Sequence, residues 1–216
     1  MIENKQFTKL NKKTVNGIVM PHGFVSGLLS ENIADKTNIY SILSHSLSRD
    51  YSKKLSELAK VDNLEPGFII LSVYIFLLGE ISKQKKIEVQ VIDDNGIIIP
   101  MEIDLSQIED FVCLFKIVSA EINKYKKDAN KEIKELVLTA NEKQKYIIIP
   151  AFGIAEMVNN TEYGNLFDIL MEVYVKEDYV EIILKYNKYK IVKNEIESFF
   201  EQVLSLIQIL IDEFND

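Results

Sequence analysis

The sequence has few of the residues that build most reactive sites. Its 216 residues include one cysteine, Cys113, one arginine, Arg49, and two histidines. A lone cysteine excludes an internal disulfide and a cysteine-based metal cluster, and its place in FVCLF predicts a buried, inert thiol. Because arginine forms the bidentate forks that grip phosphates and carboxylates, a single arginine leaves anion binding to lysines or backbone amides. These absences fit a reducing compartment.

An excess of positive charge is also missing. Lysine and arginine together number 25 against 33 acidic residues, which gives a formal net charge of -8. Without a basic stripe, nucleic acid is not an expected partner. The eight glycines are scattered, without the spacing of a Walker loop or a dinucleotide fingerprint, so no cofactor is indicated.

No apolar run is long enough to cross a membrane. The longest, GFIILSVYIFLLG (67–79), is shorter than the roughly 20 residues that a bilayer requires, and Glu65 and Glu80 flank it. We expect this segment to be a helix buried on most sides. The charged N-terminus is not followed by an apolar segment, so it does not resemble a secretory signal. These patterns predict a cytoplasmic protein.

Catalytic and metal-binding constellations are absent from the sequence as well. His22 and His45 lie in unrelated contexts, and neither has a partner at metal-ligand spacing. In a strand, Ser44 and Ser46 would point to the face opposite His45, so they could not be activated by it. We therefore predict no catalytic residue and no metal site.

Alternating and helical patterns are clear along the first half of the chain. A strand is predicted from Asn38, followed by a helix capped by Ser48 and a second helix from Pro66 to about Lys83. Two alternating runs flank the hairpin signal of residues 94–96, and Pro100 places the second run at a sheet edge or a bulge. A long helix capped by Ser106 should follow. Its predicted apolar stripe is Ile108, Phe111, Val112, Phe115, Val118, Ile122 and Tyr125.

The second half ends in the clearest pattern of the chain. A short helical piece is predicted around Ile133, Leu136 and Val137, and then a strand interrupted by Pro150. A hairpin that turns near residues 177–178 leads into a terminal helix. The residues that this helix is expected to bury are Ile196, Phe199, Phe200, Val203, Ile207, Leu210, Ile211 and Phe214.

Together these elements predict an α/β fold. About six strands should form one mixed, mostly antiparallel sheet with helices packed on one face. We divide the chain into an irregular N-terminal arm (1–36) and a single domain (37–216).

The order of the elements resembles one lobe of a known domain. SHSLSRDYSKKLSELAKVDNLEPGFIILSVYIFLLGEISKQKKIEVQV is similar to the start of the C-terminal lobe of a nonribosomal peptide synthetase condensation domain. GIIIPMEIDLSQIEDFVCLFKIVSAEINKYKKDANKEIKELV and YIIIPAFGIAE resemble the strand, long helix and next strand of that lobe. NLFDILMEVYVKEDYVEIILKYNKYKIVKNEIESFFEQVLSLIQILI resembles its final hairpin and closing helix. The match covers about Leu43 to Phe214 and implies a single lobe of the chloramphenicol acetyltransferase-like fold.

The resemblance also shows what is missing. The family's catalytic HHxxxDG motif belongs to the first lobe, and this chain has no His-His pair. The glycine-arginine and G-x-F-x-N segment expected between Val91 and Met101 is replaced by DDNG. We therefore expect a noncatalytic protein that binds a peptide synthetase component or carrier protein in nonribosomal peptide or related biosynthesis, such as that of an antibiotic. One alternative is half of a split acyltransferase whose HHxxxDG lobe is a separate chain, and another is a self-assembling structural protein, such as a homodimer.

A lobe without its mate should expose the surface that the mate normally covers. We place the expected apolar patch near IIIPAF (147–152) and the DDNG hairpin. The residues predicted to bind a partner are Ile147, Ile149, Pro150, Phe152, Asp94 and Asn95.

Overall fold

The computed structural model describes most of the chain: residues 12–15, 17–26, 39–61, 63–93, 98–127, 135–138, 146–154, 166–176 and 178–215. The helices are α1 (Arg49–Val61), α2 (Pro66–Ser82), α3 (Phe111–Lys127) and α4 (Lys193–Asn215). The strands are β1 (Lys12–Val15), β2 (Ile18–Val19), β3 (Tyr40–Ser46), β4 (Lys86–Ile92), β5 (Ile98–Asp104), β6 (Glu135–Leu138), β7 (Ile147–Ile148), β8 (Pro150–Ile154), β9 (Ile169–Lys176) and β10 (Tyr179–Asn187).

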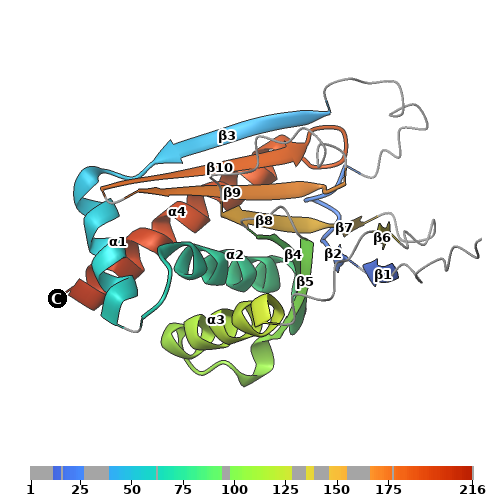
Figure 1. Cartoon of the computed structure of the whole chain (residues 1–216). Coiled ribbons are helices and arrows are strands. Elements are labelled where there is room, and N and C mark those ends of the chain that lie inside the picture. Colours follow the sequence, from blue (N-terminus) through green and yellow to red (C-terminus); the bar gives the residue numbers. More distant parts are fainter. Residues whose placement is uncertain are drawn as a thin grey trace, which may run out of the picture.

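A six-stranded sheet in the order β3-β10-β9-β8-β4-β5 organises the fold (Figure 1). The strand β8 runs parallel to both of its neighbours, and the other three pairings are antiparallel. Both predicted hairpins, β4–β5 and β9–β10, are present, and Pro100 lies on the edge strand β5 as predicted. The expected mixed α/β class is therefore confirmed.

The helices gather on one side of this sheet, with α3 beside α2 (Figure 1). Alternate residues of each central strand face them: Met171 of β9, Leu184 of β10 and Phe152 of β8 are completely buried in the main core. From the helical side, α4 contributes Phe199, whose ring meets the ring of Tyr74 on α2 at 5.9 Å between centroids. The core thus lies between α2, α4 and the sheet.

The first two helices begin where the sequence indicates. The hydroxyl of Ser48 accepts a hydrogen bond of 3.3 Å from the Tyr51 amide, and Pro66 occupies the first turn of α2. Most of α2 is buried, as its apolar run predicts, and its C-cap residue is Lys83, which has a left-handed φ of 57°. Among the described residues, no single helix has the length and apolar composition of a membrane span. The helices α1 and α2 meet that test only as a pair, which is bent by 94°.

The start of the third helix differs from the prediction. Ser106 lies in a separate 3₁₀ turn (Leu105–Gln107), where its amide donates to the Asp104 carboxylate. The helix α3 begins at Phe111 instead, because the Asp110 carboxylate accepts a 2.7 Å hydrogen bond from the Cys113 amide. Cys113 itself is half-buried rather than buried.

Two other expectations were wrong. Leu136 and Val137 belong to β6, which pairs in parallel with β1, so a strand partner distant in sequence overrides the local helical pattern; Ile133 lies outside the described residues. Phe214 keeps 43% of its surface exposed, because it lies in the last turn of α4, beyond the buried stripe that ends at Ile211.

Part of the N-terminal arm is built into the core. Ile18, Met20, Phe24 and Val25 are all buried, and Val25 forms a β-bridge with Ile191. Polar contacts reinforce this attachment, since the amide of residue 26 donates to the carbonyl of residue 190 and the amide of residue 192 to that of residue 24. Residues 17–26 therefore pack against the turn between β10 and α4.

Candidate functional site

The residues predicted to bind a partner divide between two environments. Pro150 and Phe152 are buried, and Phe152 faces the helices, where its ring lies 6.2 Å from that of Tyr74. Ile147 is half-buried in β7, opposite Val19 of β2. Asp94 and Asn95 lie outside the described residues. Only Ile147 and Ile149 of this set therefore retain exposed surface among the described residues.

Ile149 belongs to a second hydrophobic cluster, on the face of the sheet turned away from the helices. Strand alternation places the cluster there, because its strand residues alternate with the helix-facing positions of β4, β5, β8 and β9; they are Ile92, Ile98, Ala151, Leu170 and Tyr174. We call it the sheet-face patch. It consists of the buried Ile92, Ala151, Phe167 and Leu170 and the partly exposed Ile98, Ile149, Leu166 and Tyr174. Ile98 is the second residue after the DDNG segment (93–96), so the patch includes residues next to both predicted segments.

A buried ion pair borders the sheet-face patch. Glu172 of β9 has no exposed surface, and both of its carboxylate oxygens lie within 2.8 Å of the Lys185 Nζ on β10. On the same face of the sheet, Gln90 of β4 is also fully buried, and its Oε1 has no hydrogen-bond partner among the residues that the structure describes. The sheet face therefore combines apolar side chains with a few buried polar groups.

A second acid and lysine, Asp168 and Lys190, form an ion pair at the other end of the patch. Asp168 accepts hydrogen bonds from the Ile149 amide at 2.9 Å and from Lys190 Nζ at 2.7 Å. The hydroxyl of Tyr40 donates nearby, to the Phe167 carbonyl. Burial, together with the Asp168 carboxylate, raises the pKa of the Tyr40 hydroxyl to about 12. The hydrogen bond from its amide to Asp168 fixes the position of Ile149, which packs in the same cluster as Phe167.

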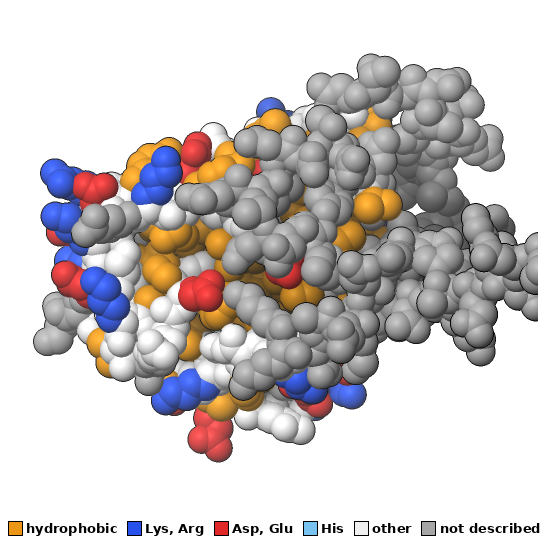
Figure 2. All heavy atoms as spheres, viewed as in Figure 1, with side chains coloured by type: hydrophobic (Ala, Val, Ile, Leu, Met, Phe, Trp, Pro, Cys, Tyr) orange, Lys and Arg blue, Asp and Glu red, His pale blue; other side chains and the backbone are white. Residues whose placement is uncertain are grey.

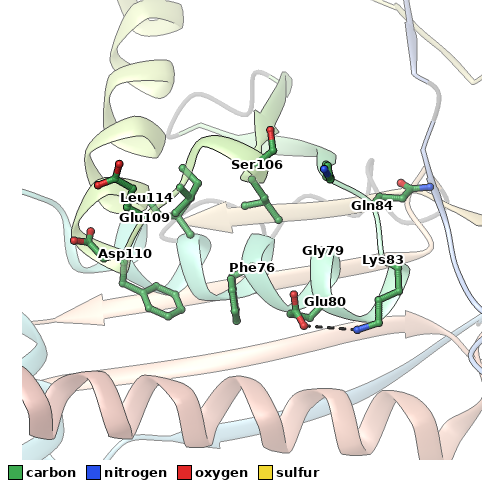
Figure 3. Close-up of a pocket in the computed structure, with 13 residues that line it drawn as sticks. Phe76, Gly79, Glu80, Lys83, Gln84, Ser106, Glu109, Asp110 and Leu114 are labelled. Carbon is green, nitrogen blue, oxygen red and sulfur yellow. Dashed lines mark ion pairs between the residues drawn. The ribbon is translucent and has the colours of Figure 1, made fainter.

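A cavity of about 470 Å³ lies elsewhere, between the end of α2 and the start of α3 (Figure 3). Its size falls in the range of small-molecule sites. Gly79 creates part of its wall, because a Cβ there would lie 2.2 Å from Leu105 Cδ1. The lining residues are Phe76, Gly79, Glu80, Lys83, Gln84, Lys85, Leu105, Ser106, Ile108, Glu109, Asp110, Phe111 and Leu114.

Charges of both signs surround the opening of this cavity. Figure 3 shows Glu109 and Asp110 at one end and the ion pair of Lys83 with Glu80, at 3.6 Å, at the other. Apolar side chains form the floor, where the rings of Phe76 and Phe111 meet edge to face at 5.0 Å between centroids. The described lining includes no histidine, cysteine or buried acid.

The two histidines are placed apart by the fold. The ring of His22 lies 3.9 Å from that of Tyr146, whereas His45 is exposed on the edge strand β3. Over the residues that the structure describes, no group of three potential metal ligands is found. Figure 2 shows the surface in the view of Figure 1, with lysine and arginine mainly toward the outline and hydrophobic side chains toward the middle, where a few acids lie among them.

Comparison with known proteins identifies the fold. No protein-family model and no curated protein matches the sequence. Among solved structures, SgcC5 from Streptomyces globisporus has a TM-score of 0.67 at 12% identity, over 92% of this chain and 52% of that chain. The EpoB peptide synthetase cyclization-docking bidomain from Sorangium cellulosum has a TM-score of 0.65 at 10% identity, over 91% and 45%. The condensation domain of the monacolin K polyketide synthase MokA has a TM-score of 0.63 at 14% identity, over 91% and 53%.

The chain has the fold of a single condensation-domain lobe. It spans about half the length of each of these structures. The resemblance seen in the sequence is thus confirmed at the level of fold, and at identities of 10 to 14% it extends no further.

Sequence reasoning missed the buried charges of the candidate site. Asp168 directly precedes β9, and it is spaced by two residues from Leu170 and by four from Glu172, so this spacing already indicates one face for both acids. A pair of acids on one face of an otherwise apolar strand was the available signal. Their burial could not be inferred, because it depends on how the sheet face is covered in the folded chain.

Proposed function

We propose that this chain is a noncatalytic condensation-like lobe that acts by binding another protein in nonribosomal peptide or related specialised-metabolite biosynthesis. The observation that carries the proposal is the sheet-face patch. It lies on a fold that makes up only half of the two-lobed structures it resembles. An apolar cluster outside the main core is the kind of surface that a protein partner covers.

The absence of the HHxxxDG motif supports a noncatalytic role. The chain contains only His22 and His45, which are not adjacent in sequence, so it supplies no His-His pair. In condensation domains that motif provides the general base. This lobe would then contribute shape and contacts, while any chemistry belongs to its partner.

The sheet-face patch also indicates the chemistry of the partner surface. Its half-exposed members, including Ile149 and Tyr174, offer an apolar centre with one aromatic hydroxyl. Lys185, which is 28% exposed, and the carboxylate of Glu181 lie on the same sheet face and would form part of a polar rim. A peptide synthetase component or a carrier protein with an apolar contact surface would match it.

Native mass spectrometry tests this proposal. The full chain should be mixed, in separate samples, with a phosphopantetheinylated carrier protein and with a condensation N-lobe from the same organism. We expect a one-to-one complex with one of them. The proposal is wrong if neither associates at about 50 µM, a concentration at which even weak interfaces are populated.

A split enzyme is the second candidate, and the half-length match favours it. In this arrangement, an HHxxxDG lobe on a separate chain would pair with this one and restore a two-lobed acyltransferase. Acyl transfer by the reconstituted pair, and not by either chain alone, would distinguish it from the noncatalytic role. A complex without acyl transfer supports the noncatalytic role.

A further inference from the structure

The two edges of the six-stranded sheet are protected differently. The Leu105 amide bonds to the Lys85 carbonyl, so by alternation the backbone groups of residues 98, 100, 102 and 104 point away from β4, toward the outer side of β5. Pro100 removes a donor at one of these outward positions, and Glu102 and Asp104 place charges at two others. Proline and charge are the usual means of preventing edge-to-edge pairing.

The opposite edge, β3, has neither kind of protection. Its seven residues, YSILSHS, contain no proline, lysine, arginine or acid. Figure 1 shows β3 as the outermost strand of the sheet, and among the described residues no strand pairs with its outer side. Ile42 is 61% exposed, and residues 44–46 are exposed as well.

The register with β10 shows which backbone groups of β3 point outward. The Leu47 amide bonds to the Val180 carbonyl, and the Lys188 amide bonds to the Ile39 carbonyl. Because inward and outward residues alternate in an antiparallel ladder, residues 41, 43 and 45 bond to β10. The amides and carbonyls of residues 40, 42, 44 and 46 therefore point away from β10, toward the outer edge of the sheet.

We propose that β3 pairs antiparallel with β3 of a second copy of this chain, about a two-fold axis through Leu43. Residue 42 then lies opposite 44, and residue 40 opposite 46. Each of the four outward-facing residues of one β3 therefore lies opposite an outward-facing residue of the other β3. The whole length of β3 is used, and two six-stranded sheets become continuous.

The side chains favour a second copy as the occupant. On the face turned away from the helices, Tyr40 would lie opposite Ser46 and Ile42 opposite Ser44, so each large side chain meets a small one. The helix-facing side would bring Leu43 against its own copy and His45 opposite Ser41, with which it can exchange a hydrogen bond. No like charges meet across the axis.

The expected dimer is weak and strengthens with salt. A single seven-residue edge buries less than a standard interface of about 1,600 Å², so we expect a Kd on the order of 10 to 100 µM. Each chain carries a net charge of -8, and this repulsion is screened as ionic strength rises. A dimer held by ion pairs would respond in the opposite direction.

Cysteine cross-linking tests the register, in a Cys113→Ser background that removes the native thiol. In a non-hydrogen-bonded pair the Cα atoms are about 4.5 Å apart, which a disulfide can span. Leu43→Cys should therefore form a covalent dimer under mild oxidation. The matched control is His45→Cys on the same strand, whose two copies would be about 13 Å apart and should not cross-link. Equal cross-linking of the two variants would overturn the proposed register.

Sedimentation velocity tests the pairing itself. Ser44→Pro removes one outward donor and leaves the ladder to β10 intact, as Pro100 does on the other edge. We expect wild type and the control Ser44→Thr to dimerise between about 10 and 500 µM, and Ser44→Pro to be monomeric. Ile42→Lys should also be monomeric, which guards against a folding defect in the proline variant. A wild-type monomer at 500 µM, or dimers of all four proteins, would overturn the proposal.

Discussion

The ammonium group of Lys185 neutralises the Glu172 carboxylate at 2.7 Å, although Glu172 is fully buried. Removing only the lysine leaves a buried charge without a partner. We expect Lys185→Met to lower the free energy of unfolding by about 3 kcal/mol in urea titrations. The double variant Lys185→Met/Glu172→Leu should recover most of that loss, because it removes both charges.

The control for this prediction is another cross-strand ion pair. Lys86 and Glu102 lie 3.5 Å apart and are both more than half exposed. Lys86→Met should therefore change stability by less than about 1 kcal/mol. Equal losses for Lys86→Met and Lys185→Met would contradict the role assigned to burial.

Tyr74 offers a prediction of the opposite sign. Its hydroxyl is completely buried, has no hydrogen-bond partner among the described residues, and has a pKa raised by that burial. Tyr74→Phe removes an unsatisfied polar atom and keeps the ring contacts with Phe152 and Phe199. We expect unfolding free energies equal to wild type or higher by up to about 1 kcal/mol. A loss above 1 kcal/mol would mean that the hydroxyl has a partner.

Tyr40 should make stability fall at high pH. Its pKa is about 12 in the folded chain, against 10.0 for the free side chain, so the unfolded chain releases the proton first. The contribution of the Tyr40 hydroxyl to the free energy of unfolding is fully present below pH 10 and is lost as the pH rises toward 12. Tyr40→Phe should be less stable than wild type by about 1 kcal/mol at pH 8, because the hydrogen bond to Phe167 is lost.

The stability gap between Tyr40→Phe and wild type should then narrow above pH 10. Urea titrations at pH 8, 10 and 11 measure it. A gap that stays constant over this range would show that the Tyr40 hydroxyl titrates normally.

The attachment of residues 17–26 can be tested at two glycines. Gly17 has φ of +68°, and a Cβ there would lie 2.6 Å from the Ile148 carbonyl oxygen, whereas nothing lies within 4 Å of a Cβ at Gly23. Gly17→Ala should cost about 1 to 3 kcal/mol. Gly23→Ala should stay within about 0.5 kcal/mol of wild type in the same thermal or urea unfolding experiment. Similar values for both would argue against the packing of this segment on β7.

The sequence predicted elements whose side-chain pattern is long and regular. The strands β9 and β10 alternate over eight and nine residues, and α4 repeats an apolar stripe, so their types and order followed from periodicity. The four residues of β6 gave no such signal, and only their pairing with β1 makes them a strand. Likewise, Asp104 and Asp110 compete with Ser106 as capping residues, and three-dimensional contacts decide between them.

The candidate site was less predictable than the fold. Ile149 was identified because it lies in an apolar run. The same run includes Phe152, but Phe152 is on the opposite face of the strand and is buried in the core. Tyr174 and Leu166 join Ile149 only through the pairing of β8 with β9. Surface patches of this kind depend on contacts between distant segments, and no local pattern encodes them.

Calorimetric titration with variants of the sheet-face patch tests the central claim most directly. The partner is the carrier protein or N-lobe that forms a complex in native mass spectrometry. Tyr174→Lys and Ile149→Lys should each weaken its binding at least about tenfold. Ile209→Lys, which alters an isoleucine 51% exposed on α4, should leave binding within about twofold of wild type. Binding that is unchanged by both patch variants, with their folds intact, would contradict the account.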